Sequence, residues 1–299
     1  MKNVLFFGGS SLLATIWANY WKERYNIFLT QHQQSIEVVG VNLIQIQEIS
    51  EAKLKTILSL YKIDLLINCV GLTSVEQCEA NPTKANYLNA EVPSILAKIC
   101  FQHKVSFIHI STDHLFDGLV ELKSESDIPK PLNQYAITKL KGDQNVINNN
   151  PDSLIIRTNF FGLGPKYRPS FSDIITSTLE RNQTIKLFSD VFFTPIHVHE
   201  LANIVFELLK ENKRGIYNVV SNERISKYDF GLLIAENLNL PKSLILQGSI
   251  SERDDLVIRP CDMSLSNNKV NNTINIEIKS LTNQIKELIQ NKLKTNDTI

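Results

Sequence analysis

The sequence predicts an α/β protein with a doubly wound parallel sheet in its first half and a smaller mixed part after it. In the first half, short apolar segments alternate with amphipathic segments of helix length, which is the pattern of parallel strands joined by crossover helices. After Gly164-Pro165 this alternation becomes less regular. A length of 299 residues suits about two domains. We therefore predict a Rossmann-type domain in residues 1–165, to which a segment near 190–220 returns, and a smaller part in residues 166–299.

The first half contains six segments with the length and composition of buried strands. They are Val4–Phe7, Ile27–Thr30, Val38–Val41, Leu65–Cys69, Ser106–Ile110 and Leu154–Arg157. Between most of them lie helix-length segments, namely Leu12–Glu23, Ile49–Tyr61, Pro82–Phe101 and Gln134–Asn148. In the segment that begins at Pro82, apolar residues recur every three or four positions, which predicts one buried helical stripe.

The second half predicts fewer strands and a different order of elements. Helices are expected at Phe171–Arg181, Val198–Glu211, Lys227–Leu238 and Ser280–Lys292, with strands near Ile185–Phe188 and Ile216–Val220. This mixture indicates a second core that is separate from the parallel sheet.

Composition excludes several classes of protein. The chain has 31 Lys+Arg and 31 Asp+Glu, hence a formal net charge of +0, which argues against a uniformly basic surface for nucleic acid. Its 43% hydrophobic and 21% charged residues are those of a folded globular protein. The four cysteines show no paired spacing, so we expect a reducing, cytoplasmic setting with no disulfide framework and no metal site.

The apolar stretch at the start of the chain is interpreted as a strand and a helix and not as a signal peptide. Gly8–Ser11 interrupts this stretch where the apolar core of a leader would be continuous. Elsewhere no run of about 18 apolar residues occurs, so the sequence predicts no membrane span.

The loop after the first strand has the position of a dinucleotide-binding loop. Such a loop needs a tight turn, close approach of the backbone to pyrophosphate, and a helix N-terminus. The usual glycine series reads here Gly8-x-x-Ser11-x-x-Ala14, so only its first glycine is present. By itself this loop is as consistent with an ordinary strand-to-helix turn. After the second strand, Gln31-His32 offers no carboxylate for a ribose hydroxyl, which slightly favours NADP over NAD.

Tyr135 and Lys139 form a YxxxK pair on a predicted helix. A spacing of four residues places both side chains on one helical face. A nearby ammonium group is expected to lower the pKa of the phenol, as a proton donor that works near neutrality requires. Ser111 and Thr112 follow a predicted strand, at the edge where open parallel sheets bind ligands. Their hydroxyls could polarise a carbonyl that Tyr135 protonates.

Eight short blocks carry a resemblance to a known family. They are Ile67–Gly71, Val75–Glu79, Asn89–Glu91, Ser111–Gly118, Pro131–Lys139, Arg157–Gly162, Thr194–Val198, and Arg259-Pro260 with Ser264-Leu265. In these blocks the chain resembles the extended short-chain dehydrogenase/reductases, in the dTDP-4-dehydrorhamnose reductase-like (RmlD-like) branch. The resemblance extends from the first strand to about Lys269.

The resemblance implies a catalytic set of Thr112, Tyr135 and Lys139. Tyr135 would protonate a carbonyl oxygen while NADPH or NADH delivers hydride to the carbon. Lys139 would bind the nicotinamide ribose, and Thr112 would hydrogen-bond the carbonyl.

The resemblance also implies the binding residues. Those expected to contact the cofactor are Gly8, Ser10, Ser11, Leu12 and Leu13 at the pyrophosphate, Asn42 and Leu43 at the adenine, and Val70, Gly71 and Leu72 along the dinucleotide, together with Tyr135 and Lys139. Those expected to contact a nucleotide-sugar are Ser74, Val75, Thr112, Asp113, Phe160 and Arg259.

Three departures from the family pattern bear on function. The glycine loop is eroded, His114 stands where a tyrosine is usual, and Asn42 replaces an aspartate. Arg157 ends a strand and is interpreted either as a structural ion-pair partner or as a substrate contact. His197 and the nearby His199 have no carboxylate or cysteine at ligand spacing, so we interpret them as structural.

The function implied is reduction of a 4-keto-6-deoxy nucleotide-sugar, as in dTDP-rhamnose and polysaccharide biosynthesis. Two alternatives remain open. One is a nucleotide-sugar epimerase, which uses the same tyrosine and lysine. The other is a non-catalytic NADP-binding regulatory subunit, like that of methionine adenosyltransferase. The expected partner is the nucleotide-sugar and not nucleic acid or a membrane. The sequence leaves the oligomeric state open, a homodimer included.

Overall fold

The computed structural model describes residues 1–296, with side chains through Gln290, and it divides into two compact units. The first unit comprises Met1–Leu115, Pro131–Arg157 and Asn212–Tyr217, and the second comprises Phe116–Lys130, Thr158–Glu211 and the chain from Asn218 onward. The sequence division at residue 165 assigned residues 116–130 to the first domain, whereas they group here with the second unit. The cause is hydrogen bonding to Ser264, whose hydroxyl accepts from the Leu122 N–H at 2.8 Å and whose carbonyl accepts from the Lys123 N–H at 3.0 Å.

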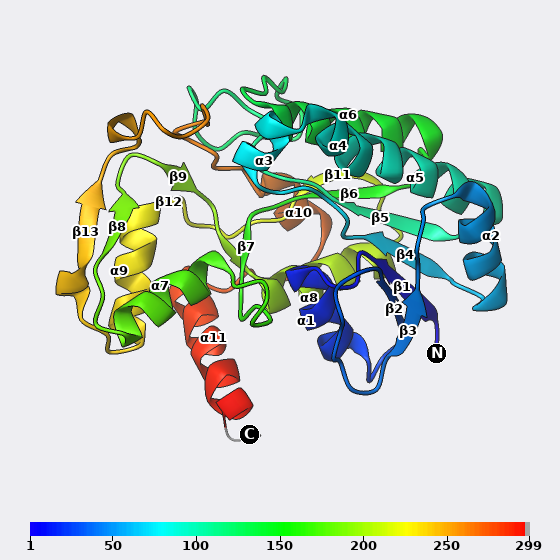
Figure 1. Ribbon diagram of the computed structural model, residues 1–299, viewed down its shortest axis with the longest axis horizontal. Coiled ribbons are helices and arrows are strands. Elements are labelled where there is room, and N and C mark those ends of the chain that lie inside the picture. Colours follow the sequence, from blue (N-terminus) through cyan, green and yellow to red (C-terminus); the bar gives the residue numbers. More distant parts are fainter. Residues whose placement is uncertain (297–299) are drawn as a thin grey trace. The chain divides into compact units, whose positions relative to one another are not determined.

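The first unit is built on a seven-stranded sheet, which confirms the predicted doubly wound fold (Figure 1). Its strands are β1 (Asn3–Phe7), β2 (Asn26–Gln31), β3 (Asn42–Gln45), β4 (Leu65–Asn68), β5 (Ser106–Ile110), β6 (Leu154–Arg157) and β11 (Gly215–Asn218). They lie in the order β11-β6-β5-β4-β1-β2-β3, and the ladders from β6 to β3 are parallel. The strand order reverses between β1 and β4, which is the switch point where such sheets bind ligands.

The helices of the first unit follow the predicted segments with two differences, one of which is a short helix at Val75–Ala80 that the sequence did not predict. They are α1 (Leu12–Trp21), α2 (Glu51–Leu60), α3 (Val75–Ala80), α4 (Pro82–Asn86), α5 (Val92–His103) and α6 (Gln134–Asn149). The segment expected as one helix from Pro82 contains a π-helical turn, η1 (Tyr87–Glu91), between α4 and α5. A π turn carries i to i+5 hydrogen bonds and is frequent at functional sites.

The third strand begins later than predicted. The expected strand Val38–Val41 is irregular, and β3 starts at Asn42. Two features account for the error. Gly40 adopts a φ of +83° in a turn, a left-handed conformation that ends extended structure. Val39 is 86% exposed, so its apolar side chain contributes nothing to the core.

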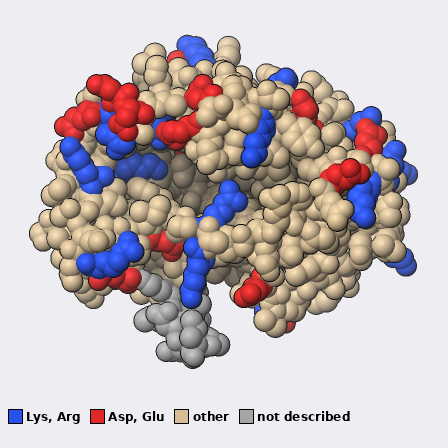
Figure 2. All heavy atoms as spheres, viewed as in Figure 1, with Lys and Arg blue, Asp and Glu red and all other residues tan. Residues whose placement is uncertain are grey.

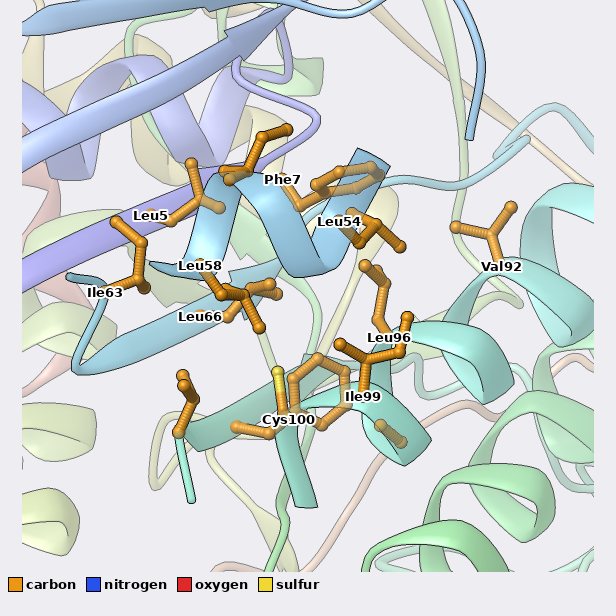
Figure 3. Packing of buried hydrophobic residues seen from close by; sticks show 14 of the residues in the cluster. Leu5, Phe7, Leu54, Leu58, Ile63, Leu66, Val92, Leu96, Ile99 and Cys100 are labelled. Atoms are coloured by element: carbon orange, nitrogen blue, oxygen red, sulfur yellow. The ribbon is translucent and has the colours of Figure 1, made fainter. Parts of the chain in front are cut away.

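The core on one face of the sheet fixes the positions of the strands that carry the candidate site. Leu5 and Phe7 of β1 pack with Leu54 of α2 and with Leu96 and Ile99 of α5 (Figure 3). Each of these five side chains is almost fully buried, and burial of such a side chain stabilises a fold by about 1.5–3 kcal/mol. The carboxyl end of β1 is therefore held firmly where the next loop begins.

The second unit has its own aromatic core and three two-stranded sheets. The sheets pair β7 (Phe160–Phe161) with β10 (Ile196–His197), β9 (Phe192–Phe193) with β12 (Ile225–Ser226), and β8 (Ile185–Phe188) with β13 (Ile245–Gly248). The helices are α7 (Phe171–Glu180), α8 (Val198–Lys210), α9 (Lys227–Asn237), α10 (Asn268–Thr273) and α11 (Leu281–Asn296), with 3₁₀ turns at Lys242–Leu244 and Ile250–Glu252. Phe230 lies 5.2 Å from Phe161 and 5.3 Å from Phe193, measured between ring centroids.

The surface matches the balanced composition. On the face shown in Figure 2, Lys and Arg side chains lie among Asp and Glu side chains and are not gathered by sign. Among the residues that the structure describes, no helix has the length and apolar character needed to cross a membrane.

Candidate active site

The loop between β1 and α1 has the close packing that a dinucleotide loop requires. Gly8 has a φ of +90°, and a Cβ there would lie 2.9 Å from the Val70 backbone nitrogen. A Cβ at Gly9 would lie 2.7 Å from the Thr30 carbonyl oxygen. The Gly8 N–H donates to the Thr30 hydroxyl at 2.8 Å. Both glycines are therefore sterically necessary, although the sequence pattern singled out only the first.

The N-terminus of α1 is capped by Ser11, the residue that replaces a family glycine. The Ser11 hydroxyl accepts a hydrogen bond from the Ala14 N–H at 3.1 Å. The first turn of the helix contains no acidic residue, so the positive end of its dipole can receive an anion. Leu12 and Leu13 contribute first-turn amides, which have no intrahelical acceptor. This end of α1 can therefore hold a phosphate group.

Ser11→Ala is expected to lower the free energy of unfolding more than Ser11→Gly does. Loss of a serine N-cap to alanine costs about 1 kcal/mol, whereas glycine costs only a few tenths of a kcal/mol. Urea unfolding of Ser11→Ala and Ser11→Gly measures the difference directly. If Ser11→Ala unfolds at the same urea concentration as the wild type, the hydrogen bond to Ala14 does not stabilise α1.

The strand β4 ends in a loop, Val70–Leu72, that two buried asparagines hold in place. The Asn68 carbonyl oxygen accepts from the Val70 N–H at 3.1 Å. Asn89 accepts from the Leu72 N–H at 2.8 Å and donates to the Leu72 carbonyl at 3.1 Å. The loop expected to line the cofactor is thus fixed by side chains on both sides.

Asn89 owes its position to the π turn and to the helix that crosses it. It lies within η1 and also donates to the Thr138 hydroxyl at 3.1 Å. Gly142 of α6 allows the approach, because a Cβ there would lie 2.1 Å from the Asn89 carbonyl oxygen. The helix that carries Tyr135 and Lys139 is thereby positioned against the loop Val70–Leu72.

Tyr135, Lys139 and Thr112 lie together at the carboxyl end of β5. All three are buried, with exposures of 8%, 4% and 4%. The Lys139 ammonium donates to the Ile110 carbonyl at 2.7 Å. The Tyr135 phenol is hydrogen-bonded to the Thr112 hydroxyl. The structure therefore brings together the three residues that the sequence proposed as a set.

The acid–base properties of this set differ from the expectation. Burial raises the pKa of the Tyr135 phenol, and the hydrogen bond with Thr112 opposes this rise only in part. Burial also lowers the pKa of Lys139 to about 8, against the attraction of the Asp143 carboxylate. The expected lowering of the phenol pKa by the ammonium group is not found, because burial has the largest effect on Tyr135 and raises that pKa, and the neighbouring Asp113 carboxylate adds to the rise.

A buried charged cluster lies one helical turn beyond Lys139. The Asp143 carboxylate accepts from Arg157 Nε at 3.2 Å, and its other oxygen lies 3.7 Å from His109 Nε2. The Asn68 amide group donates to His109 Nδ1 at 3.0 Å, which places the proton of a neutral imidazole on Nε2. Burial lowers the pKa of His109 well below its usual value. Of the two interpretations of Arg157, the structure therefore supports the structural ion pair.

The residues expected at the adenine lie at the wrong end of their strand. Asn42 opens β3, and its amide group donates to the Ile27 carbonyl at 3.1 Å. Leu43 follows it and pairs with Leu29 of β2. Dinucleotides bind beyond the carboxyl ends of parallel strands, whereas Asn42 and Leu43 open β3, in register with Phe28 and Leu29 and not with the carboxyl end of β2. The residues beyond the carboxyl end of β3 are Ile46 and Gln47.

The residues expected to contact substrate fall in both units. In the first, Ser74 caps α3 by accepting from the Gln77 N–H at 3.2 Å, and Val75 is buried behind it. Asp113 accepts from the Thr112 hydroxyl at 3.2 Å. In the second unit, Phe160 lies in β7, and Arg259 Nε donates to the Val257 carbonyl at 3.3 Å. Ser74, Asp113 and Arg259 thus make hydrogen bonds within the protein that hold them in place.

His114 contacts the tyrosine of the set directly. Its ring lies edge-on to the Tyr135 ring, with centroids 5.4 Å apart. The backbone N–H of His114 donates to the Thr112 hydroxyl at 3.3 Å. The residue that departs from the family pattern is thus in contact with two members of the candidate catalytic set.

Comparison with known proteins adds family membership to this geometry. The family model described as the RmlD substrate binding domain matches residues 3–294. The chain is 31% identical over 258 residues to the probable low-salt glycan biosynthesis reductase Agl14 of Haloferax volcanii, covering 85% of this chain and 86% of that protein. It is 29% identical over 202 residues to methionine adenosyltransferase 2 subunit beta of Xenopus laevis, covering 65% of this chain and 60% of that protein.

Solved structures share the whole architecture. A hypothetical dTDP-4-dehydrorhamnose reductase from Sulfolobus tokodaii superposes with a TM-score of 0.82 at 29% identity, covering 95% of this chain and 99% of that one. The dTDP-4-dehydrorhamnose reductase of Bacillus anthracis, solved in complex with NADP, gives a TM-score of 0.83 at 20% identity over 97% of this chain and 100% of that one. The match across residues 3–294 shows that the chain belongs to the RmlD substrate binding domain family.

Proposed function

We propose that this protein is a nicotinamide-dependent reductase that converts the C4 ketone of a 6-deoxy nucleotide-sugar to an alcohol. The observation that carries the proposal is the buried set of Thr112, Tyr135 and Lys139 beside β5, at the carboxyl edge of the sheet. Membership of the RmlD family and the likeness to a glycan biosynthesis reductase support the same class of substrate.

The residues at the switch point fit a dinucleotide. Gly8 and Gly9 let the loop after β1 pack closely on the backbone at Val70 and Thr30, which supports a tight turn in front of the N-terminus of α1. We assign the pyrophosphate to the loop from Gly8 through Ser10 and Ser11 to Leu13, and the dinucleotide wall to Val70–Leu72. Lys139 would hold the nicotinamide ribose, and Ile46-Gln47 would replace Asn42-Leu43 at the adenine. When bound, the cofactor supplies the hydride.

The chain's own residues donate the proton and stabilise the phenolate that remains. The raised pKa of Tyr135 keeps its phenol protonated at neutral pH, so it has a proton to give to the ketone oxygen. The Thr112 hydroxyl donates its single proton to Asp113 at 3.2 Å and would orient the same oxygen by turning that proton toward it. After transfer, Thr112 stabilises the phenolate, since its hydrogen bond favours the charged form and opposes the rise of the phenol pKa.

Affinity for NADPH is expected to depend on pH through the protonation of Lys139. Because burial lowers the pKa of Lys139 to about 8, the ammonium form is lost as the pH rises through that value. Affinity for NADPH should therefore fall above pH 8. The same series of NADPH affinities against pH, measured with Tyr135→Phe, serves as the control. The fall in affinity above pH 8 should persist in this variant, because it does not depend on the phenol. An affinity that stays level across this range would contradict a charged Lys139 at the ribose.

The preference for NADPH over NADH is part of the proposal. The residues after β2 are His32, which contacts the Gln47 carbonyl at 3.1 Å, and Gln33. Neither carries the carboxylate that would repel a 2′-phosphate. Steady-state kinetics with both cofactors are expected to give the higher kcat/KM with NADPH, and a large advantage for NADH would contradict this argument.

The family resemblance supports Ser74, Val75 and Asp113 of the first unit as substrate contacts, and it supports Phe160 and Arg259 of the second unit independently. The test is incubation with NADPH and either dTDP- or UDP-4-keto-6-deoxy-glucose, followed by absorbance and product analysis. Oxidation of NADPH with formation of the C4 alcohol is expected. Interconversion of sugar epimers without net NADPH use would indicate an epimerase. NADPH binding with no turnover on either sugar would indicate a regulatory subunit, the second alternative that the sequence left open.

A further inference from the structure

Three side chains of the second unit gather where β10 meets α8. They are His197 at the end of β10, His199 in the first turn of α8, and Glu287 of α11. One ligand atom from each lies within 4.8 Å of the other two. His199 Nδ1 lies 3.7 Å from Glu287 Oε1, and the two imidazole rings have centroids 5.0 Å apart. The sequence interpretation of both histidines as structural missed this grouping, because the carboxylate comes from a distant part of the chain.

The backbone holds the cluster together independently of any ligand. The His197 N–H donates to the side-chain oxygen of Gln284 at 2.7 Å, and the Gln284 amide donates to the Lys279 carbonyl at 2.7 Å. Gln284 precedes Glu287 by one helical turn, so the same face of α11 carries both side chains. The position of Glu287 beside the histidines is thus fixed by a buried contact.

His197 offers a nitrogen that the described part of the chain does not use. Its side chain is 1% exposed, and Nδ1 has no hydrogen-bond partner among the described residues. A buried polar atom without a partner is energetically unfavourable. Burial, reinforced by His199, lowers the pKa of His197 to about 3. The imidazole is therefore neutral near neutral pH, which is the form that binds metals.

Glu287 presents one oxygen to the histidines and the other to a lysine. Lys279 Nζ lies 2.9 Å from Glu287 Oε2 and 3.5 Å from the buried Glu200 carboxylate. The hydrogen bond with His199 lowers the pKa of Glu287 to about 2. Glu287 is therefore an ionised carboxylate, and Glu200 offsets the charge of Lys279. Oxygen Oε1 faces His199 and is directed away from the lysine contact.

We propose that His197, His199 and Glu287 bind a divalent transition-metal ion, with Zn²⁺ as the best match. Two imidazoles and one carboxylate are ligands typical of zinc and are poorly suited to Mg²⁺ or Ca²⁺, which prefer oxygen. Zinc bonds of about 2.0–2.2 Å require the three side chains to draw closer by about 1 Å. His199 and Glu287 are 18% and 26% exposed, so an ion can enter and water can fill a fourth position. Such an ion would tie α11 to the turn between β10 and α8.

The test is calorimetric titration of tag-free, chelator-treated protein with Zn²⁺, Ni²⁺ and Mg²⁺. His199→Ala and Glu287→Gln remove ligands that are partly exposed, so both variants are expected to fold. His103→Ala is the matched control at an exposed histidine, and Cys261→Ser removes an exposed thiol that could bind zinc by itself. Melting curves without metal verify that each variant is folded.

One equivalent of Zn²⁺ is expected to bind the wild type and both controls, and Mg²⁺ should not compete. Each cluster variant should bind Zn²⁺ at least about tenfold more weakly, since removal of one ligand takes away a large share of metal affinity. Zinc should also raise the melting temperature of the wild type but not that of His199→Ala. No zinc binding in the wild type, equal binding in the cluster variants, or loss of binding in Cys261→Ser would each overturn the proposal.

Discussion

Tyr135→Phe is expected to lower kcat by about 10²–10⁴-fold, the usual contribution of a positioned general acid. The variant loses only the hydroxyl, which is hydrogen-bonded to Thr112 in a buried site. The ring can keep its edge-on contact with His114, so the fold around β5 should be unchanged. Affinity for NADPH should also be nearly unchanged, because the glycine loop and Lys139 remain. Steady-state reduction of a 4-keto nucleotide-sugar and a fluorescence titration with NADPH measure the two quantities.

The matched control is Tyr167→Phe, which removes a hydroxyl from a tyrosine that is 43% exposed in the second unit. This control should retain full activity. A loss of less than about tenfold in Tyr135→Phe would remove Tyr135 from the role of proton donor. A parallel loss of NADPH affinity would instead indicate that the phenol positions the cofactor.

Gly142→Ala is expected to be the most destabilising single methyl addition in α6. The added Cβ would lie 2.1 Å from the Asn89 carbonyl oxygen, which belongs to backbone and cannot rotate away. Overpacking of this kind costs about 1–3 kcal/mol and sometimes more, and we expect a loss near the upper end. Activity should fall as well, because any shift of α6 from η1 moves Tyr135 and Lys139 together. Denaturant unfolding and kcat measure the two effects.

Gln144→Ala is the control, since it adds no atoms and changes an exposed position of the same helix. It should leave the free energy of unfolding within about 0.5 kcal/mol of the wild type. If Gly142→Ala is as stable and as active as this control, then the close contact between α6 and η1 does not position the catalytic set.

The sequence was sufficient to predict most of the sheet, because β1, β2, β4, β5 and β6 of the first unit are local, largely apolar runs. It failed at β3, where Val39 is apolar but exposed and Gly40 ends the extended segment. It also missed the paired strands β7, β9, β10 and β12, which are two residues long. Segments so short carry no periodicity, and they exist only because the second unit brings distant segments together.

The residues of the candidate site also differ in whether local sequence was enough to find them. Tyr135 and Lys139 were found because their spacing on one helix is local information. Asn89 stood in a block that matched the family, but nothing local showed that its amide would hold the loop at Leu72. Asp143 and Glu287 act through partners far along the chain. The pKa of Tyr135 was predicted in the wrong direction because burial, which a sequence does not display, outweighs the effect of its neighbours.

The π turn at η1 has a consequence for insertions and deletions in this chain. It lies between α4 and α5 within one nearly continuous helical run and accommodates one residue more than an α-helix would in the same span. Deletion of one residue between Tyr87 and Glu91 would let the run close as ordinary α-helix, without a break. The deletion would rotate the side chains on one side of it relative to those on the other, because each residue turns an α-helix by about 100°. The Asn89 amide would then face away from Leu72, and a protein that still folds would have lost the hydrogen bonds that hold the loop Val70–Leu72.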